Sequence, residues 1–290
     1  GEQPLLRDMG EGRSLPRGLP APRGGGFDER LVAVMPTIVV SNQKGGVGKT
    51  PPCINLAAEL GRCGYSVLAV DMDPQANCTS GLGVNASNLS KSLYNVLLGD
   101  IPMREAILGT AWEGISLLPS SLDLAGAEIE LASTISRESK LKRQLEQLEG
   151  FDVVLVDCPP SLGILTLNAL TACDRLLVPI QCEYYALEGV GQLVRTVDLV
   201  RDSLNPSLEV SGILLTLYDS RTRLANEVAD EVRRQFGSVV FDTVVPRNVK
   251  LSEAPSYGAP IAYYEEHSTG AQAYESLAGE VIQRWLSERP

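Results

Sequence analysis

The stretch Lys44-Gly45-Gly46-Val47-Gly48-Lys49-Thr50 decides the fold. It follows an apolar run, Thr37-Ile38-Val39-Val40, and precedes a segment that we expect to be helical from about Ile54 to Leu60. A strand, a glycine-rich turn and a helix form a cradle for phosphate, because glycines let backbone N–H groups approach the ligand and the helix N-terminus adds positive charge. The stretch therefore predicts a nucleotide site. A glycine-rich hairpin turn is the alternative, which the two lysines and the following hydroxyl disfavour.

The match to the usual phosphate-loop pattern G-x-x-x-x-G-K-[ST] is incomplete. Gly48-Lys49-Thr50 fits its end, but Gln43 replaces the first glycine and a second lysine, Lys44, precedes the glycine pair. In this pattern the later lysine reaches the β- and γ-phosphates and the hydroxyl ligates Mg²⁺.

Composition and charge exclude several classes of protein. The 290 residues carry a net charge of −11, which argues against coating of nucleic acid by the whole surface. A local basic patch remains compatible with that charge, because screening confines charge effects to about 10 Å. No apolar run approaches the roughly 20 residues that span a bilayer. The 6 cysteines form no C-x-x-C pair, so we expect reduced, mostly buried thiols in a cytoplasmic protein, with a metal or Fe–S role as the alternative.

The chain divides into a leader and one domain. Residues 1–34, rich in Gly, Pro and Arg, are expected to be disordered, and residues 35–290 to form a single domain. Strand-like apolar runs alternate there with helical segments, which predicts an α/β fold with a doubly wound, mainly parallel sheet and helices on both faces. We expect strands at 37–41, 66–71, 115–119, 153–157, 175–180, 208–217 and 239–244, and helices at 52–63, 92–97, 125–131, 139–148, 163–172, 187–203, 224–236 and 270–286.

Acidic residues follow two of these strands. Asp71 and Asp73 come at the end of one, and Asp157 ends another. Ligands of such sheets bind at the carboxyl ends of strands, and an acid there can hold Mg²⁺ directly or through water. Alone, Asp71 and Asp73 fit a solvated strand-end turn equally well. Glu183 follows a third strand, where a loop facing the ligand and a packed loop are both compatible with the sequence.

Basic residues gather late in the chain, and His267 is expected to be a surface residue. A solvated helix face and contact with a nucleic-acid backbone are equally consistent with charge alone. The cluster consists of Arg221, Arg223, Arg233, Arg234, Arg247 and Lys250.

From about Met35 to Leu286 the chain resembles the ParA family of partition ATPases, deviant P-loop NTPases related to MinD. The motifs that carry the resemblance are the loop 44–50, Asp71-Met72-Asp73-Pro74-Gln75, Asp157-Cys158-Pro159-Pro160-Ser161-Leu162-Gly163, residues 181–189 and residues 246–256.

The resemblance implies specific roles for these residues. ATP and Mg²⁺ would be the ligands, with Thr50 and Asp157 on the metal and Pro246 and Asn248 lining the adenine pocket. Lys49, with the loop amides of Gly45, Gly46, Val47, Gly48 and Thr50, would hold the phosphates. Asp73 would orient the attacking water.

The resemblance also implies partners. Lys44 would reach the phosphates of the other subunit in an ATP-dependent homodimer. Arg221 and Lys250, supported by Arg223 and Arg247, would bind DNA non-specifically. A ParB-like protein would stimulate a slow ATP hydrolysis that drives chromosome or plasmid partition at the nucleoid.

One departure from the family is Pro51-Pro52, where threonines are usual. Pro51 lacks the N–H that would reach the α-phosphate, and each proline biases the residue before it away from helical geometry. Weakened nucleotide binding, and hence a catalytically weak ATP-binding protein, is one alternative. A MinD-like ATPase on a membrane surface is another, which the weakly basic C-terminal segment disfavours. An electron-carrying relative is the third, and the cysteine spacing offers no obvious ligand set.

Overall fold

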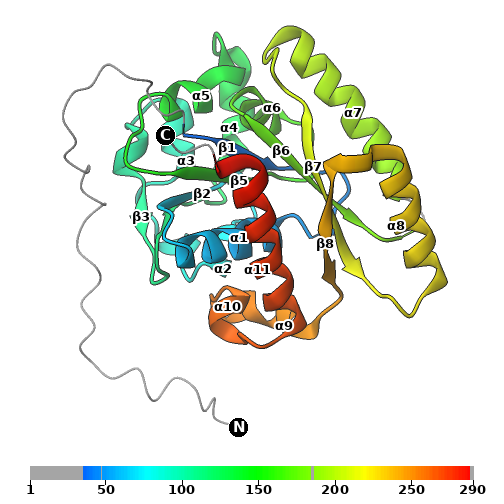
Figure 1. Ribbon diagram of the computed structural model, residues 1–290. Coiled ribbons are helices and arrows are strands. Elements are labelled where there is room, and N and C mark those ends of the chain that lie inside the picture. Colours follow the sequence, from blue (N-terminus) through cyan, green and yellow to red (C-terminus); the bar gives the residue numbers. More distant parts are fainter. Residues whose placement is uncertain (1–34, 47, 184–185, 288–290) are drawn as a thin grey trace, which may run out of the picture.

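The computed structural model describes residues 35–46, 48–183 and 186–287. The predicted leader and Val47 lie outside the described residues. The described chain forms an eight-stranded sheet in the order β3-β4-β2-β5-β1-β6-β7-β8 (Figure 1). Its strands are β1 (Thr37–Val40), β2 (Val67–Asp71), β3 (Leu108–Gly109), β4 (Ile115–Leu118), β5 (Val153–Asp157), β6 (Arg175–Gln181), β7 (Val210–Tyr218) and β8 (Val240–Pro246).

All neighbouring strands run parallel except β3 and β4, which confirms the predicted doubly wound α/β fold. The register pairs Val40 with Asp157 and Asp71 with Asp157. The ends of β1, β5 and β2 therefore lie at one level of the sheet. Since the glycine-rich loop follows β1, the acids of β2 and β5 come to lie beside it.

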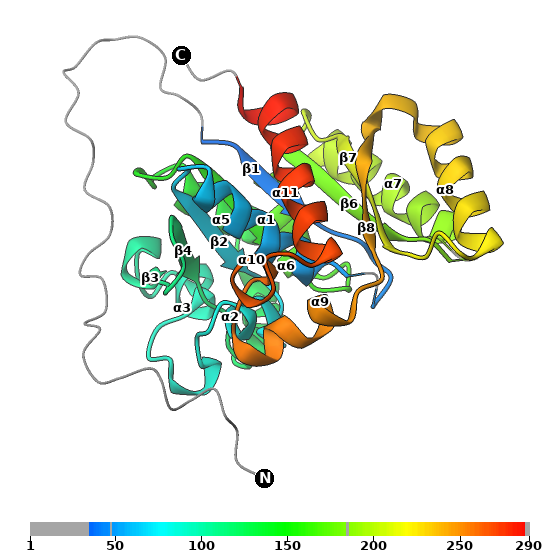
Figure 2. The same ribbon diagram turned by 60° about the horizontal axis from the view of Figure 1, so that its bottom comes forward.

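Helices cover both faces of the sheet. They are α1 (Thr50–Arg62), α2 (Asn77–Gly81), α3 (Leu93–Leu98), α4 (Leu124–Glu130), α5 (Lys140–Leu145), α6 (Ile164–Thr171), α7 (Ala186–Ser203), α8 (Arg223–Phe236), α9 (Val249–Glu253), α10 (Ile261–Tyr264) and α11 (Thr269–Val281). Alternate strand residues face opposite sides. Ile38 and Val40 pack with α1 and α11, whereas Val39 packs in the core that α3 to α8 cover. Figure 2 shows α11 lying along α1.

The predicted strands and longer helices are present, with ends that shift by a few residues. The sequence missed β3, which is two residues long, and the short helices α2, α9 and α10. The last helix is regular only to Val281 and continues as a π-helical turn, Ile282–Leu286.

The start of α1 corrects one expectation. The helix begins at Thr50 rather than at Pro52, so Thr50 and Pro51 are both helical despite the bias that a following proline imposes. The first N–H groups of a helix have no intrahelical acceptor, so prolines in the first turn cost it no backbone hydrogen bond.

Candidate functional site

The glycine-rich loop is tied at its start to the neighbouring elements β6 and α7. The buried Asn42 donates from Nδ2 to the Pro179 carbonyl at 2.7 Å and accepts from the Lys44 N–H at 3.1 Å. Gln43 Nε2 donates to Thr196 Oγ1 at 3.2 Å. Gln43, which departs from the usual pattern, is therefore a tether between the loop and α7.

The glycines of the loop leave its backbone open. Gly46 and Gly48 have φ of +75° and +78°, a region that side chains disfavour. Among the described residues, no atom lies within 4 Å of the point where a Cβ would stand on Gly45, Gly46 or Gly48. A glycine-rich loop with open space around its glycines, at the start of a 13-residue helix, fits a phosphate group.

Lys49 lies inside the loop. Its ammonium donates to the Lys44 carbonyl at 3.0 Å, and the residue is 8% exposed. Burial lowers the pKa of Lys49, while the nearby Asp157 and Asp73 oppose that shift. Among the described residues, Lys49 forms no ion pair with a carboxylate, so its charge is left for the phosphates that the loop would bind.

Asp157 ends β5 in full burial, and within the described chain neither of its carboxylate oxygens has a hydrogen-bond partner. Burial and the charge of Asp71 raise the pKa of Asp157, whereas Thr50 and Lys49 oppose the shift. A buried acceptor without a donor is costly, and native structures retain one only for a reason. A divalent cation shared with the Thr50 hydroxyl would satisfy both oxygens, so this donor set fits Mg²⁺.

Asp71 and Asp73 have different environments. Asp71 is fully buried and accepts from both the N–H and the hydroxyl of Thr79 at 2.7 Å. Burial raises the pKa of Asp71 to about 6. Asp73, at 9% exposure, accepts from the Gln75 N–H at 2.9 Å. Asp71 is thus committed to holding α2 through Thr79, whereas the carboxylate of Asp73 is slightly exposed.

The four predicted DNA-contacting cations lie beyond the ends of β7 and β8, and each has an acidic partner. Arg221 is in the turn before α8 rather than in the helix itself, and Arg223 is the first residue of α8. The pairs are Arg221–Asp219 at 2.7 Å, Arg223–Glu227 at 2.6 Å, Lys250–Glu253 at 2.9 Å and Arg247–Glu183 at 3.7 Å. We call these four cations the cationic edge.

Pro246 and Asn248 lie beside this edge. Pro246 ends β8, and Asn248 caps α9 by accepting from the N–H groups of Lys250 and Leu251 at 2.8 and 3.3 Å. Its Nδ2 donates to Thr269 Oγ1 at 2.8 Å. The structure shows these two residues holding the β8–α9 connection.

Asn55 is a residue that the sequence reasoning missed. It is buried in α1, donates to the Pro51 carbonyl at 2.9 Å and accepts from the Ile261 N–H at 2.7 Å. It links the loop helix to α10. A single asparagine in an apolar helical run is the only sequence signal, and it does not name the partner.

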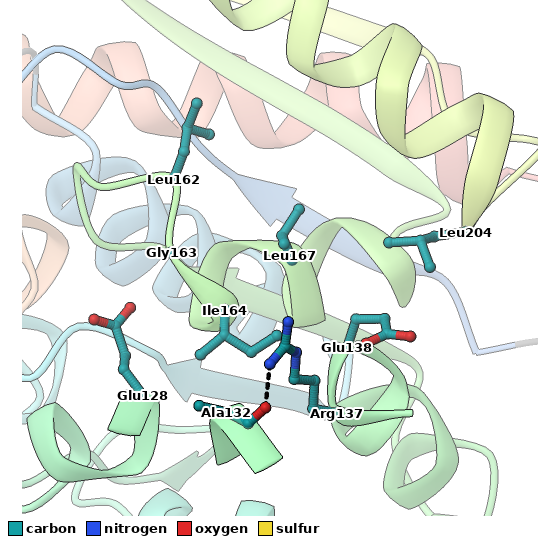
Figure 3. Close-up of a pocket in the computed structure, with 9 residues that line it drawn as sticks. All are labelled: Glu128, Ala132, Arg137, Glu138, Leu162, Gly163, Ile164, Leu167 and Leu204. Carbon is teal, nitrogen blue, oxygen red and sulfur yellow. Dashed lines mark hydrogen bonds between the residues drawn. The ribbon is translucent and has the colours of Figure 1, made fainter. Parts of the chain in front are cut away.

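The loop after Asp157 leads to a hollow of about 380 Å³ (Figure 3). Leu162, Gly163, Ile164 and Leu167 form one wall, and Arg137 reaches across to donate to the Ala132 carbonyl.

The cysteines are buried except for Cys63, and His267 is exposed, as expected. Among the described residues, no group of three or more His, Cys, Asp and Glu side chains is arranged to hold a metal ion by itself. Within the same part of the chain, no helix is both long and apolar enough to cross a bilayer.

The chain is similar to several known proteins. A family model described as an AAA domain matches residues 35–210. The chain is 51% identical over 245 residues to the sporulation initiation inhibitor protein Soj of Bacillus subtilis, covering 84% of this chain and 97% of Soj. It is 49% identical over 250 residues to the chromosome partitioning protein ParA of Caulobacter vibrioides, covering 85% and 94%. A crystal structure of cobyrinic acid a,c-diamide synthase from Mycobacterium smegmatis, with bound ADP and magnesium, is 42% identical and superposes with a TM-score of 0.77 over 88% of this chain and 97% of that one.

Proposed function

Because the chain belongs to the ParA family of chromosome-partitioning ATPases, we propose that it is an ATP-driven switch that dimerises and binds DNA non-specifically. The observation that carries this proposal is the buried Asp157 carboxylate, without a hydrogen-bond partner in the described chain, beside Lys49 and Thr50. A relative solved with ADP and magnesium supports the same ligands.

The residues of the loop divide the work of binding. Thr50 and Asp157 would hold Mg²⁺, which neutralises phosphate charge when bound. Lys49 and the open amides of Gly45, Gly46 and Gly48, together with Val47, would bind the β- and γ-phosphates. Asp73 would orient water for attack, and Pro246 and Asn248 would lie against the adenine.

Lys44 would act in trans. Its backbone is anchored by Asn42, whereas its side chain has, among the described residues, a single ion pair of 3.7 Å with Glu183. We infer that the side chain could leave this pair and reach the phosphates of a second copy. Charge supplied by a partner subunit is a known way to activate phosphoryl transfer. The same dimer would join two cationic edges, and avidity would make DNA binding depend on nucleotide.

The partners and place follow from this switch. A ParB-like protein would stimulate hydrolysis, and the protein would work in the cytoplasm on the nucleoid, moving chromosome or plasmid DNA. Without the partner, hydrolysis would be slow, so the dimer would stay bound to DNA until the ParB-like protein reaches it.

A second candidate function is that of a catalytically weak ATP-binding protein, and Pro51 is the residue that favours it. Proline at this position removes one backbone donor from the first turn of α1. The membrane alternative finds less support, because Trp285 packs edge-on against Phe241 with ring centroids 5.3 Å apart and Arg284 pairs with Glu280 at 2.9 Å. These contacts pack the segment 284–285 against the rest of the domain.

The test is DNA binding by gel shift, with and without ATP, for wild type, Lys49→Ala and Lys250→Ala. We expect ATP to promote binding by wild type, Lys49→Ala to lose the ATP effect, and Lys250→Ala to bind weakly in both conditions. Binding that ignores ATP, or that survives Lys250→Ala unchanged, would count against the proposal. Co-sedimentation with anionic vesicles in ATP tests the membrane alternative.

A further inference from the structure

Glu183 lies between two cations that belong to different parts of the molecule. Its Oε2 is 3.7 Å from Lys44 Nζ, and its Oε1 is 3.7 Å from Arg247 Nη2. Gln181 Nε2 also donates to Oε1. One carboxylate therefore serves the loop lysine and a member of the cationic edge at the same time.

The sheet order creates this arrangement. β6, which leads into Glu183, lies between β1, which leads into Lys44, and β7. Arg247 follows β8 but is fixed on β7, because its N–H donates to the Tyr218 carbonyl at 2.9 Å. The backbone segments that carry Lys44, Glu183 and Arg247 therefore lie side by side at the carboxyl ends of the strands. The exposed Glu183 side chain lies between the two cations.

The two pairs are long and shared, unlike the 2.6–2.9 Å pairs elsewhere on the edge. Exposed ion pairs of this kind contribute little each and are screened by salt. Their combined effect is a weak restraint, which a tightly bound nucleotide can overcome.

We propose that Glu183 is a brake that holds Lys44 in its own subunit and Arg247 away from DNA, so that one carboxylate sets both the ATP concentration needed for dimerisation and the affinity for DNA. This inference rests on the proposed function, since it concerns the lysine that would act in trans. It assigns Glu183 a positioning role, because the carboxylate acts through the two cations.

The test compares Glu183→Gln with Glu253→Gln. Both substitutions remove one negative charge and free one member of the cationic edge. Glu183→Gln also frees Lys44, whereas Glu253 pairs with Lys250 and, within the described residues, makes no ion pair to the loop 44–50. Dimerisation is measured by analytical ultracentrifugation against the concentration of a slowly hydrolysed ATP analogue. Affinity for a fluorescent non-specific duplex is measured by anisotropy at fixed salt.

We expect Glu183→Gln to lower the half-maximal nucleotide concentration for dimerisation about two- to fivefold and to tighten DNA binding by a similar factor. Glu253→Gln should tighten DNA binding alone. In an Arg247→Gln background, the DNA effect of Glu183→Gln should disappear while that of Glu253→Gln persists.

The inference is overturned if Glu183→Gln dimerises at the wild-type nucleotide concentration or at a higher one, or if Glu253→Gln shifts that concentration equally. A wild-type protein that stays monomeric in the nucleotide would instead overturn the proposed function, and this inference with it. Circular dichroism of each variant verifies that the exposed substitutions leave the fold intact.

Discussion

Two regions at the same edge of the sheet treat charge in opposite ways. Around the glycine-rich loop, Asp157 is fully buried without a hydrogen-bond partner in the described chain, and Lys49 is almost buried. On the cationic edge, each of the four predicted DNA contacts is paired with a carboxylate; the three arginines are exposed and Lys250 is half-buried. The first region carries uncompensated charge that a ligand would satisfy. In the second region, DNA must first break the ion pairs that hold the cations. We therefore expect tight binding of nucleotide in the first region and weak, salt-sensitive binding of DNA in the second.

The largest expected effect separates the two lysines. Lys49→Ala should weaken ATP binding about 10- to 100-fold, because it removes a charged hydrogen bond to phosphate in a nearly dry site. Lys250→Ala, the matched loss of a lysine on the cationic edge, should leave ATP affinity at the wild-type value. Isothermal titration calorimetry measures the ATP affinity of each variant. An equal loss of affinity in the two variants would contradict the difference between the two regions.

Asp157→Asn should separate stability from binding. Without nucleotide, the variant should be more stable by about 1–3 kcal/mol, because a buried carboxylate without a donor is replaced by a neutral amide. With Mg²⁺ and ATP, the rise in melting temperature seen for wild type should shrink. Thermal melts with and without ligand give both values, and a less stable ligand-free variant would contradict the assignment.

Replacing both prolines with threonine should strengthen nucleotide binding. The double variant Pro51→Thr, Pro52→Thr regains a backbone donor toward the α-phosphate, and ATP binding should tighten by about 1–3 kcal/mol. Pro52→Thr alone serves as the control, because the donor in question belongs to position 51. An unchanged dissociation constant in the double variant would remove Pro51 as a reason for weak activity.

The smallest effect is expected on the cationic edge. Asp219→Asn should free Arg221 and tighten DNA binding about two- to fivefold at low salt, with the gain lost at high salt. Hydrogen bonds from Arg221 lower the pKa of Asp219 to about 2. The depressed value means that the pair is present above the unfolded pKa, about 3.9, and is lost only as the pH falls through about 2. Asp219 therefore stays ionised between pH 5 and pH 8. Over that range, its titration should not change the gain in DNA affinity of Asp219→Asn, as measured by anisotropy.

The sequence predicts elements well where the chemistry is local. Near-continuous apolar runs such as 153–157 identify strands covered on both faces, and the loop 44–50 carries its own signature. The two-residue β3 has too few residues for any periodicity, and α9 depends on the Asn248 cap rather than on an apolar pattern.

The relations between distant residues could not be predicted in the same way. Asp157 and Thr50 meet because β5 pairs with β1, and Glu183 meets both Lys44 and Arg247 because β6 lies between β1 and β7. Strand order is a property of the whole sheet, so a single sequence read locally does not contain it. The anchoring of Asp71 by Thr79, eight residues on, likewise depends on how α2 folds back.

The packing of α11 along α1 has a consequence for synthesis. The helix that begins at the nucleotide loop is covered by Tyr274, Leu277 and Ala278 near the end of the chain, and Asn55 within it bonds to Ile261. During translation the loop therefore emerges early, yet its supporting helix stays uncovered until α11 has left the ribosome. We expect a nascent chain to be unable to hold nucleotide until α11 has been made, so a product truncated before Thr269 would not compete with the folded domain for ATP.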